Sequence, residues 1–340
     1  MFDIIQKRKI WLSFSGFLVA VSVLAILVWG LKLGIDFTGG SLLEVKFNTD
    51  RPANSDIEEA VRDLDLGSLI VQSVGEDGVI LRFQNTSQEK HQKTLEKLEE
   101  LVQKNNTENL EDESATATGT ESVDIDLDIV AGSGTTTAVI IQTDFENKLV
   151  EELRYDSVGG TIGQELKTKS LNAIIVVLIF IMLFIAWSFR KVSKPVASWK
   201  YGLAAIIALV HDVTITIGIF AVLGRFLNIE INTPFVAAIL TVLGYSVMDT
   251  IVVFDRIREN LPKSDDSFEE TVNTSVNQII RRSINTSMTT LICLLSIFIF
   301  GGESIRSFVL ALIIGVFFGA YSSIFLASPI LAVCNKLSRI

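Results

Sequence analysis

Two aspartates of this sequence stand within long apolar segments, where an ionised group is costly and is therefore a functional candidate. Asp249 lies in the apolar segment 235–254, and Asp212 lies near the middle of the segment 201–223. A carboxylate surrounded by a low dielectric holds its proton more readily, and an approaching guanidinium favours release of that proton. Asp249 and Arg282 together therefore have the chemistry to bind and release a proton as the protein changes shape.

Polar residues that begin with Arg282 share the helical spacing i, i+3, i+4 and i+7, which places them on one face of a helix. They are Arg282, Asn285, Thr286 and Thr289. This stripe could solvate a proton path beside Asp249. In the alternative interpretation Asp249 is a static polar contact that cross-links helices. Asp212 is a second candidate, although His211 beside it points about 100° away on a helix and is not expected to face the same site.

The elements that carry these residues are apolar stretches long enough to cross about 30 Å of hydrocarbon. They are residues 10–31, 171–189, 201–223, 235–254, 284–300 and 305–333. The first stretch is longer than the apolar part of a signal peptide and no small-residue cleavage site follows it, so a retained helix is expected. The mean hydropathy of +0.45 fits apolar residues concentrated in such blocks.

Lys and Arg residues beside these six segments predict the orientation of the chain. Fourteen of them lie before the first segment, after the second, after the fourth and after the last, whereas two lie in the short loops after the third and fifth. We therefore expect residues 1–9 and 334–340 to be cytoplasmic. Residues 32–170 should lie outside the cytoplasm, and residues 171–333 should hold helices two to six.

The segment 32–170 has the pattern of a small α+β domain. Strand-like alternation covers residues 41–47, 69–74, 79–83 and 152–158, and amphipathic helices are expected at 54–64 and 88–103. The order βαββαβ is typical of a ferredoxin-like domain. The predicted fold class is an α-helical polytopic membrane protein with six transmembrane helices and a small ferredoxin-like extracytoplasmic domain.

An acidic insert at residues 105–152 holds twelve acidic residues and one basic residue, which accounts for the whole net charge of −10. Its first part, 105–120, has the composition of a disordered segment. Alternation around Asp124, Asp126 and Asp128, followed by a β-like run at 138–142, allows an extra hairpin. Carboxylates suit Ca²⁺, but carboxylates at i and i+2 on a strand share its solvated face, so neither a metal site nor a cofactor is expected.

Several classes of protein are excluded by composition. The acidic charge disfavours a nucleic-acid-binding protein. The two cysteines, Cys293 and Cys334, cannot build a disulfide framework. The sequence contains no Walker A motif, so energy from ATP would have to come from another protein, and an enzyme is not expected.

Four motifs carry a resemblance to a known family: GIDFTGG at 34–40, SVGGTIG at 157–163, GYSVMDTIVVFDRIREN at 244–260 and FGGESIR at 300–306. They resemble the SecF family, the smaller half of the SecDF protein-export factor in the resistance-nodulation-division superfamily. The matching residues of the first and third motifs include Gly34, Asp36, Phe37, Gly39, Gly40, Gly244, Tyr245, Ser246, Thr250, Asp255, Arg256, Arg258, Glu259 and Asn260.

The resemblance implies a subunit of the bacterial cytoplasmic (inner) membrane that pairs with SecD, associates with the SecYEG channel and uses the proton-motive force to promote translocation of unfolded chains. It matches Asp249 to the carboxylate of the family's proton path and Arg282 to the basic residue that opens the fifth helix. The implied partners are SecD, SecYEG, the translocating chain and the lipid bilayer, with no nucleic acid. Two alternatives stay open: a small-molecule or lipid exporter of the same superfamily, and a non-conducting scaffold of the channel.

Overall fold

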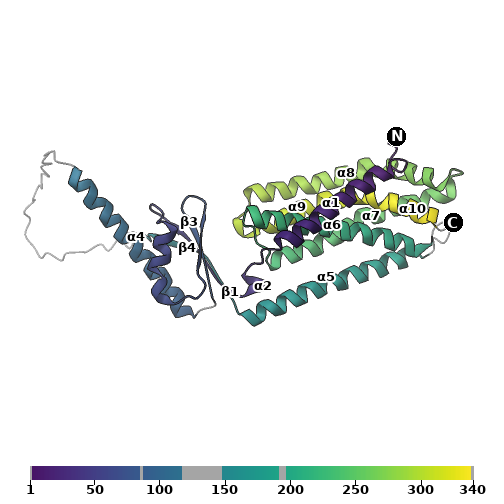
Figure 1. Cartoon of the computed structure of the whole chain (residues 1–340). Helices are drawn as coiled ribbons and strands as arrows, with labels where there is room; N and C mark the ends of the chain where they lie inside the picture. The colour runs from purple at the N-terminus through teal and green to yellow at the C-terminus, as the bar shows by residue number, and fades with distance from the viewer. Residues whose placement is uncertain (1, 85–86, 117–147, 191–196, 338–340) are drawn as a thin grey trace, which may run out of the picture. The chain divides into compact units, whose positions relative to one another are not determined.

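The chain folds into two compact units, a helical unit of Met1–Thr38 with Thr161–Ile340 and an α+β unit of Gly39–Gly160 (Figure 1). The residues that the computed structural model describes are 2–84, 87–116, 148–190 and 197–337 of the 340. The predicted acidic strand around Asp124, Asp126 and Asp128, and the β-like run 138–142, lie outside these described residues.

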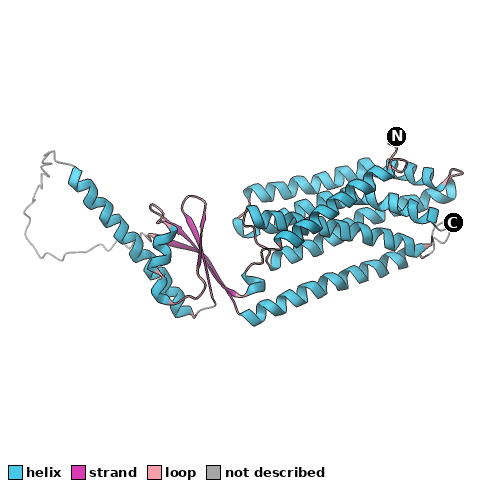
Figure 2. Cartoon of the chain, viewed as in Figure 1, coloured by secondary structure: helices cyan, strands magenta, loops and turns pink. Residues whose placement is uncertain are grey.

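Six helices of the described chain are long and apolar enough to span a membrane, which confirms the six predicted segments. Their elements are α1 (Arg8–Trp29), α5 (Gly160–Ser188), α6 (Ser198–Phe226), α7 (Thr233–Asn260), α8 (Phe268–Phe300), and a last span built from α9 (Glu303–Ser322), the π-helical turn η3 (Ser323–Ala327) and α10 (Ser328–Leu337). They lie side by side as a bundle (Figure 2). The chain is therefore a polytopic membrane protein.

Helices α5 and α8 begin roughly three and four turns earlier than the apolar runs predicted. Hydropathy detects only the part of a helix that suits hydrocarbon, and the polar first turns continue the same hydrogen-bonded ladder. At the start of α8 a capping box stabilises the first turn. The Ser267 hydroxyl accepts a bond from the Glu270 amide, and the Glu270 carboxylate accepts one from the Ser267 amide.

The last predicted span, 305–333, is interrupted by η3, which the periodicity did not indicate. Before this turn, Gly315 and Gly319 pack on α7 of the same chain. A Cβ atom at Gly315 would lie 2.2 Å from a methyl group of Val242, and one at Gly319 would lie 3.1 Å from the Cβ of Ser246. The small-residue face of this helix therefore brings two helices close together within the bundle.

The segment before α1 packs into the bundle. Ile4 and Ile5 are buried in the helical core, and both of their amides donate to the Asn273 side-chain oxygen on α8. Arg8 pairs with Glu269 at 2.7 Å. These contacts fix the start of α1 against α8.

The first glycine motif positions the start of α7. The Gly34 amide donates to the Ile231 carbonyl at 2.9 Å, and the short helix α2 (Ile35–Thr38) follows. The Asp36 carboxylate then accepts a 2.7 Å bond from the Thr233 amide in the first turn of α7. A carboxylate at a helix N-terminus satisfies a free amide and complements the helix dipole. Phe37 is buried in a hydrophobic core that also holds Phe220 and Phe235.

The α+β unit has a four-stranded antiparallel sheet in the order β2-β3-β1-β4, which confirms the ferredoxin-like prediction. Its elements are β1 (Gly40–Phe47), α3 (Asn54–Ala60), the 3₁₀ turn η1 (Arg62–Leu64), β2 (Ile70–Val74), β3 (Gly78–Phe83), α4 (Gln88–Thr116) and β4 (Val150–Val158). Alternate residues of β1, among them Leu43 and Val45, meet Ile57 of α3 and Leu98 of α4 in one core.

The glycine pair at the start of β1 is required by backbone geometry. Gly39 has a φ of +74° and Gly40 a φ of +125°, both in the region that favours glycine. A Cβ atom at Gly39 would lie 2.6 Å from the Cα of Gly160. The glycine pair therefore lets the backbone at the start of β1 lie close to the backbone of Gly160, which follows β4.

The expectation of disorder over 105–120 is wrong for the residues up to Thr116, because α4 continues to that residue. Residues 105–116 hold three Glu, one Leu and one Ala, which favour a helix, among Asn, Thr, Ser and Asp residues, which favour it less. Because extending a helix costs less than nucleating one, the helix that begins at Gln88 continues through these residues.

Candidate functional site

Helix α7 carries two polar faces that meet different neighbours. Tyr245 and Asp249, four residues apart, contact α8. Ser246 and Thr250, also four residues apart, contact α6 and the turn η3. Since residues i and i+4 share a helix face, the two pairs define adjacent sides of α7.

One side forms what we call the closed cluster, made of His211, Asp212, Ser246 and Ser322. The Asp212 carboxylate has no exposed surface and accepts a 2.6 Å bond from the Ser246 hydroxyl and a 2.8 Å bond from the Ser322 hydroxyl. Its other oxygen lies 2.9 Å from Nδ1 of His211. One buried carboxylate thus ties α6 to α7 and α9.

Hydroxyl groups extend the closed cluster toward η3. The Thr250 hydroxyl lies 2.9 Å from the Ser323 hydroxyl, and Ser323 also bonds the Gly319 carbonyl at 2.9 Å. Both side chains are buried. A π-helical turn shifts the register of a helix, and here it coincides with the residues that meet α7.

The expectation that His211 and Asp212 do not face one site is wrong. Their Cα–Cβ directions differ by about 100° on the helix. The side chains are nevertheless long enough for their polar ends to swing together, and Nδ1 reaches the carboxylate. The other ring nitrogen of His211 is buried and has no hydrogen-bond partner among the described residues, while the ring stacks against Tyr321 with 6.2 Å between centroids.

The other side of α7 forms what we call the open seam, made of Tyr245, Asp249, Ser287 and Thr290. The Asp249 carboxylate accepts a 3.2 Å bond from the Ser287 hydroxyl of α8. The Tyr245 hydroxyl lies 3.3 Å from that of Thr290. Asp249 is only partly buried, in contrast to Asp212.

The predicted stripe Arg282, Asn285, Thr286 and Thr289 lies together on one exposed face of α8. Thr286 and Thr289 donate to carbonyls of their own helix. Among the described residues no ion pair joins Asp249 to Arg282. Arg282 precedes Ser287 by five residues, which places it roughly 140° around the helix from the residue that holds Asp249. The structure therefore keeps the stripe apart from the carboxylate.

The outward face of α7 beside the open seam carries small residues. Ala237, Thr241, Gly244 and Met248 are all exposed. A Cβ atom at Gly244 would meet nothing within 4 Å. Helix α8 is also largely uncovered, since 11% of its apolar stretch is buried, against 44% or more in α6, α7 and the last span. The face formed by α7 and α8 is not covered by the described chain.

The end of the α7 motif fastens α7 to α8. Arg256 and Asn260 both donate to the Gln278 side-chain oxygen, at 2.6 and 2.9 Å, and Asn260 also reaches Ser275. Charged residues also pair along α7 itself: Arg256 with Glu259 at 2.7 Å, and Arg258 with Asp255 at 3.3 Å. These contacts fix the cytoplasm-directed end predicted for the helix pair.

Sequence reasoning missed Ser287 and Thr290, which contact Asp249 and Tyr245, and it missed Ser322, which contacts Asp212. The first two belong to a second polar spacing on α8, with Ser283, that is as regular as the stripe beginning at Arg282. Periodicity alone could not decide which face meets α7. Within the described residues no group of three His, Cys, Asp or Glu side chains could hold a metal ion.

A bundle of spanning helices with carboxylates inside it, joined to a ferredoxin-like unit, defines a membrane protein of the transporter type. Residues 139–337 match the family described as protein export membrane protein SecD/SecF, C-terminal, and residues 25–50 match the SecD/SecF GG motif. The second match contains Gly39 and Gly40. The chain belongs to the SecF family of protein translocase subunits.

Curated relatives agree over nearly the whole chain. The protein translocase subunit SecF of Thermobaculum terrenum is 38% identical over 333 residues, 97% of this chain and 93% of that protein. The subunit SecF of Sebaldella termitidis is 32% identical, covering 99% of this chain and 92% of that protein.

Solved structures of SecDF share the fold. The crystal structure of SecDF, a translocon-associated membrane protein from Thermus thermophilus, matches with a TM-score of 0.70 and 27% identity. A second structure, SecDF in a super-membrane-facing form, matches with a TM-score of 0.60 and 26% identity. The chain spans 39% of the length of each of these SecDF chains, so it corresponds to part of them.

Proposed function

We propose that this chain is the SecF subunit of a protein-export complex in the bacterial inner membrane, where it pairs with a SecD subunit and uses the proton-motive force at the SecYEG channel to promote translocation of unfolded chains. Its relatives are named protein translocase subunits, and the related solved chains are SecDF. Because the present chain matches 39% of such a chain, a separate SecD subunit would supply the remainder.

The observation that carries the pairing is the uncovered polar surface inside the membrane-spanning part of the bundle. On α8, Asn285 and Thr289 are exposed on the outside of the bundle, and on α7 the small residues Thr241 and Gly244 are exposed as well. Polar groups facing hydrocarbon are unfavourable, whereas small and polar residues suit a helix interface. A second set of helices lying on α7 and α8 would cover both the exposed polar residues of α8 and the exposed small residues of α7.

In this proposal Asp249 carries the proton. It is the intramembrane carboxylate that lies beside the uncovered face, so a partner's helices and water can reach it, whereas Asp212 is fully enclosed by its hydrogen bonds. Movement of α8 that replaces Ser287 by Arg282 next to Asp249 would favour the ionised carboxylate and release its proton. Asn285, Thr286 and Thr289 would line the path that this movement opens.

Orientation follows the basic residues: both termini would be cytoplasmic, and the ferredoxin-like unit would lie outside, where it can meet emerging chains.

The two alternative functions make different demands on the chain. If the chain were a non-conducting scaffold, export would need no titrating carboxylate. The exporter alternative would need a substrate cavity in the ferredoxin-like unit.

Pairing is tested by affinity purification of tagged chain from gently solubilised membranes. A leucine at Gly244 on the outward face of α7 should prevent recovery of SecD, because it blocks close helix approach. Gly16→Leu is the matched control, since Gly16 is an exposed glycine of α1 that likewise has nothing within 4 Å. Equal recovery of SecD with Gly244→Leu and Gly16→Leu would contradict the proposed interface.

A further inference from the structure

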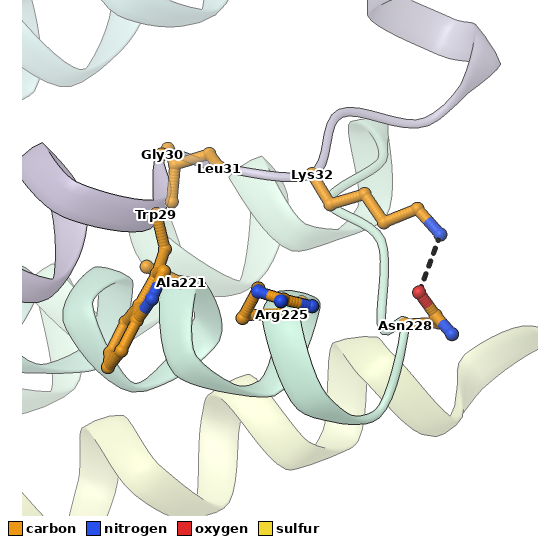
Figure 3. A pocket seen from close by; sticks show the side chains of 8 residues that line it. Trp29, Gly30, Leu31, Lys32, Ala221, Arg225 and Asn228 are labelled. Carbon is orange, nitrogen blue, oxygen red and sulfur yellow. Dashed lines mark hydrogen bonds between the residues drawn. The ribbon is translucent and has the colours of Figure 1, made fainter.

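A cavity of about 310 Å³ lies at one end of the helical unit, where α1 and α6 end. Trp29, Lys32, Arg225 and Asn228 line it together with Ala221 and Gly224 (Figure 3). In this view Arg225 lies between Trp29 and the pair formed by Lys32 and Asn228. No residue of the cavity belongs to the closed cluster or the open seam, so the proton path does not account for it.

The walls of the cavity are built by the backbone. Asn228 adopts a φ of +56° in the turn after α6. A Cβ atom at Gly224 would lie 3.2 Å from the Cβ of Lys32, so glycine lets the chain after α1 cross the end of α6. Trp29 packs edge-on against Phe226 with 5.6 Å between ring centroids. The cavity is therefore part of the fold and not a gap between loose side chains.

The charges around the cavity sum to one positive charge. Lys32 lies 3.2 Å from the Asn228 side-chain oxygen and 3.5 Å from the Glu230 carboxylate, which offsets its charge. Arg225 is exposed and has no carboxylate partner among the described residues. A guanidinium presents paired donors that match the oxygens of a phosphate group. The cavity thus suits a singly charged phosphodiester.

The surroundings of the cavity are apolar and exposed. Leu27 and Val28 of α1 are 77% and 63% exposed, and Phe226 and Leu227 at the end of α6 are 66% and 64% exposed. Tryptophan and basic residues at the end of a spanning helix lie at the level of lipid headgroups, with apolar neighbours facing the acyl chains. A phosphate group that arrives here with acyl chains attached is stabilised on both sides.

We propose that this cavity binds the headgroup of an anionic phospholipid such as phosphatidylglycerol. Arg225 pairs with the phosphodiester, Lys32 and Asn228 contact its oxygens or the headgroup hydroxyls, and the acyl chains lie along Leu27 and Val28. A volume of about 310 Å³ admits a headgroup but not a whole lipid. A zwitterionic headgroup is disfavoured because its ammonium adds a second positive charge beside Arg225.

Native mass spectrometry of the full-length chain with its co-purified partners tests this site, with phosphatidylglycerol and phosphatidylcholine as probes. We expect phosphatidylglycerol to be retained and Arg225→Gln to weaken that retention roughly tenfold, as expected for loss of a charged hydrogen-bonding group. Arg306→Gln is the matched control, since Arg306 is a basic residue in the first turn of α9 and lies over the ring of Phe298 outside the cavity. Equal losses for both variants, or equal retention of both lipids, would overturn the proposal.

A second measurement needs no variant. Full-length protein in nanodiscs that contain phosphatidylglycerol should unfold at a higher temperature than in phosphatidylcholine nanodiscs, because a ligand that binds only the folded state stabilises it. Inorganic phosphate added in excess should leave both the retained lipid and this difference unchanged. Displacement of the lipid by inorganic phosphate would show a site for the free ion, and equal unfolding temperatures would contradict a headgroup site.

Discussion

The closed cluster and the open seam each hold a carboxylate inside the membrane-spanning bundle, but they surround it differently. Asp212 is fully enclosed, and its carboxylate is held by side chains of α6, α7 and α9. Asp249 accepts a 3.2 Å bond from the Ser287 hydroxyl and has an uncovered face beside it. The difference shows that burial of an acidic residue does not by itself mark a transport site, because a satisfied carboxylate also fastens helices.

Stability should separate the two carboxylates most strongly. Asp212→Ala leaves the buried Ser246 hydroxyl without an acceptor and leaves Ser322 with only the Gly319 carbonyl at 3.2 Å, so we expect it to lower the free energy of unfolding by about 3 kcal/mol. Asp249→Ala removes one long bond at a partly exposed position and should lower it by about 1 kcal/mol or less. Unfolding in mixed detergent micelles measures both. Similar losses of unfolding free energy in Asp212→Ala and Asp249→Ala would contradict the difference between the closed cluster and the open seam.

Glycine substitutions test the packing on the two sides. Gly315→Ala puts a methyl group 2.2 Å from Val242 on the closed side, and overpacking of this kind costs about 1–3 kcal/mol of unfolding free energy. Gly244→Ala on the open side meets nothing, so the isolated chain should be unaffected or up to about 1 kcal/mol more stable. Adding Val242→Ala should recover part of the stability that Gly315→Ala loses, because it removes the two methyl groups at 2.2 and 2.6 Å. A loss with Gly244→Ala in the absence of SecD would mean that this chain itself covers the face.

Single hydroxyl groups should show a smaller form of the same contrast. Thr250→Val removes a 2.9 Å contact to Ser323 from a site that is 1% exposed, and we expect a loss of about 1 kcal/mol. Tyr245→Phe removes a 3.3 Å contact to Thr290 at a partly exposed site, and should lower the unfolding free energy by about 0.5 kcal/mol or less. A double-mutant cycle of Thr250→Val with Ser323→Ala measures how much the contact between these two hydroxyls contributes to the free energy of unfolding. A larger loss for Tyr245→Phe would reverse the assignment of the two sides.

Much of the fold could be predicted from the sequence because apolar runs and strand alternation are local signals. The six spans and the ferredoxin-like order βαββαβ were both found this way. Local signals do not report where a polar helix end stops, so the early starts of α5 and α8 and the extension of α4 to Thr116 were missed. The docking of Ile4 and Ile5 depends on Asn273, some 270 residues away, and no local pattern contains it.

The candidate site was predictable as a set of residues but not as an arrangement. Asp212 and Asp249 stood out because charged groups are rare in apolar segments. The partner of Asp249 could not be assigned, since α8 carries hydroxyls on two faces. The contact of Ser323 with Thr250 could not be assigned either, since η3 changes the helical register at Ser323. The role of Asp36 was also hidden: its bond to the Thr233 amide joins segments nearly 200 residues apart.

We propose that Asp249 in the open seam, and not the closed cluster, couples the chain to the proton gradient. The most direct measurement is export into vesicles that contain this subunit with SecD and the channel, with and without a proton gradient. Asp249→Asn should fold, pair and unfold as the wild type does, yet lose the stimulation of export that the gradient produces. Stimulation of wild-type size in the Asp249→Asn vesicles would contradict the account.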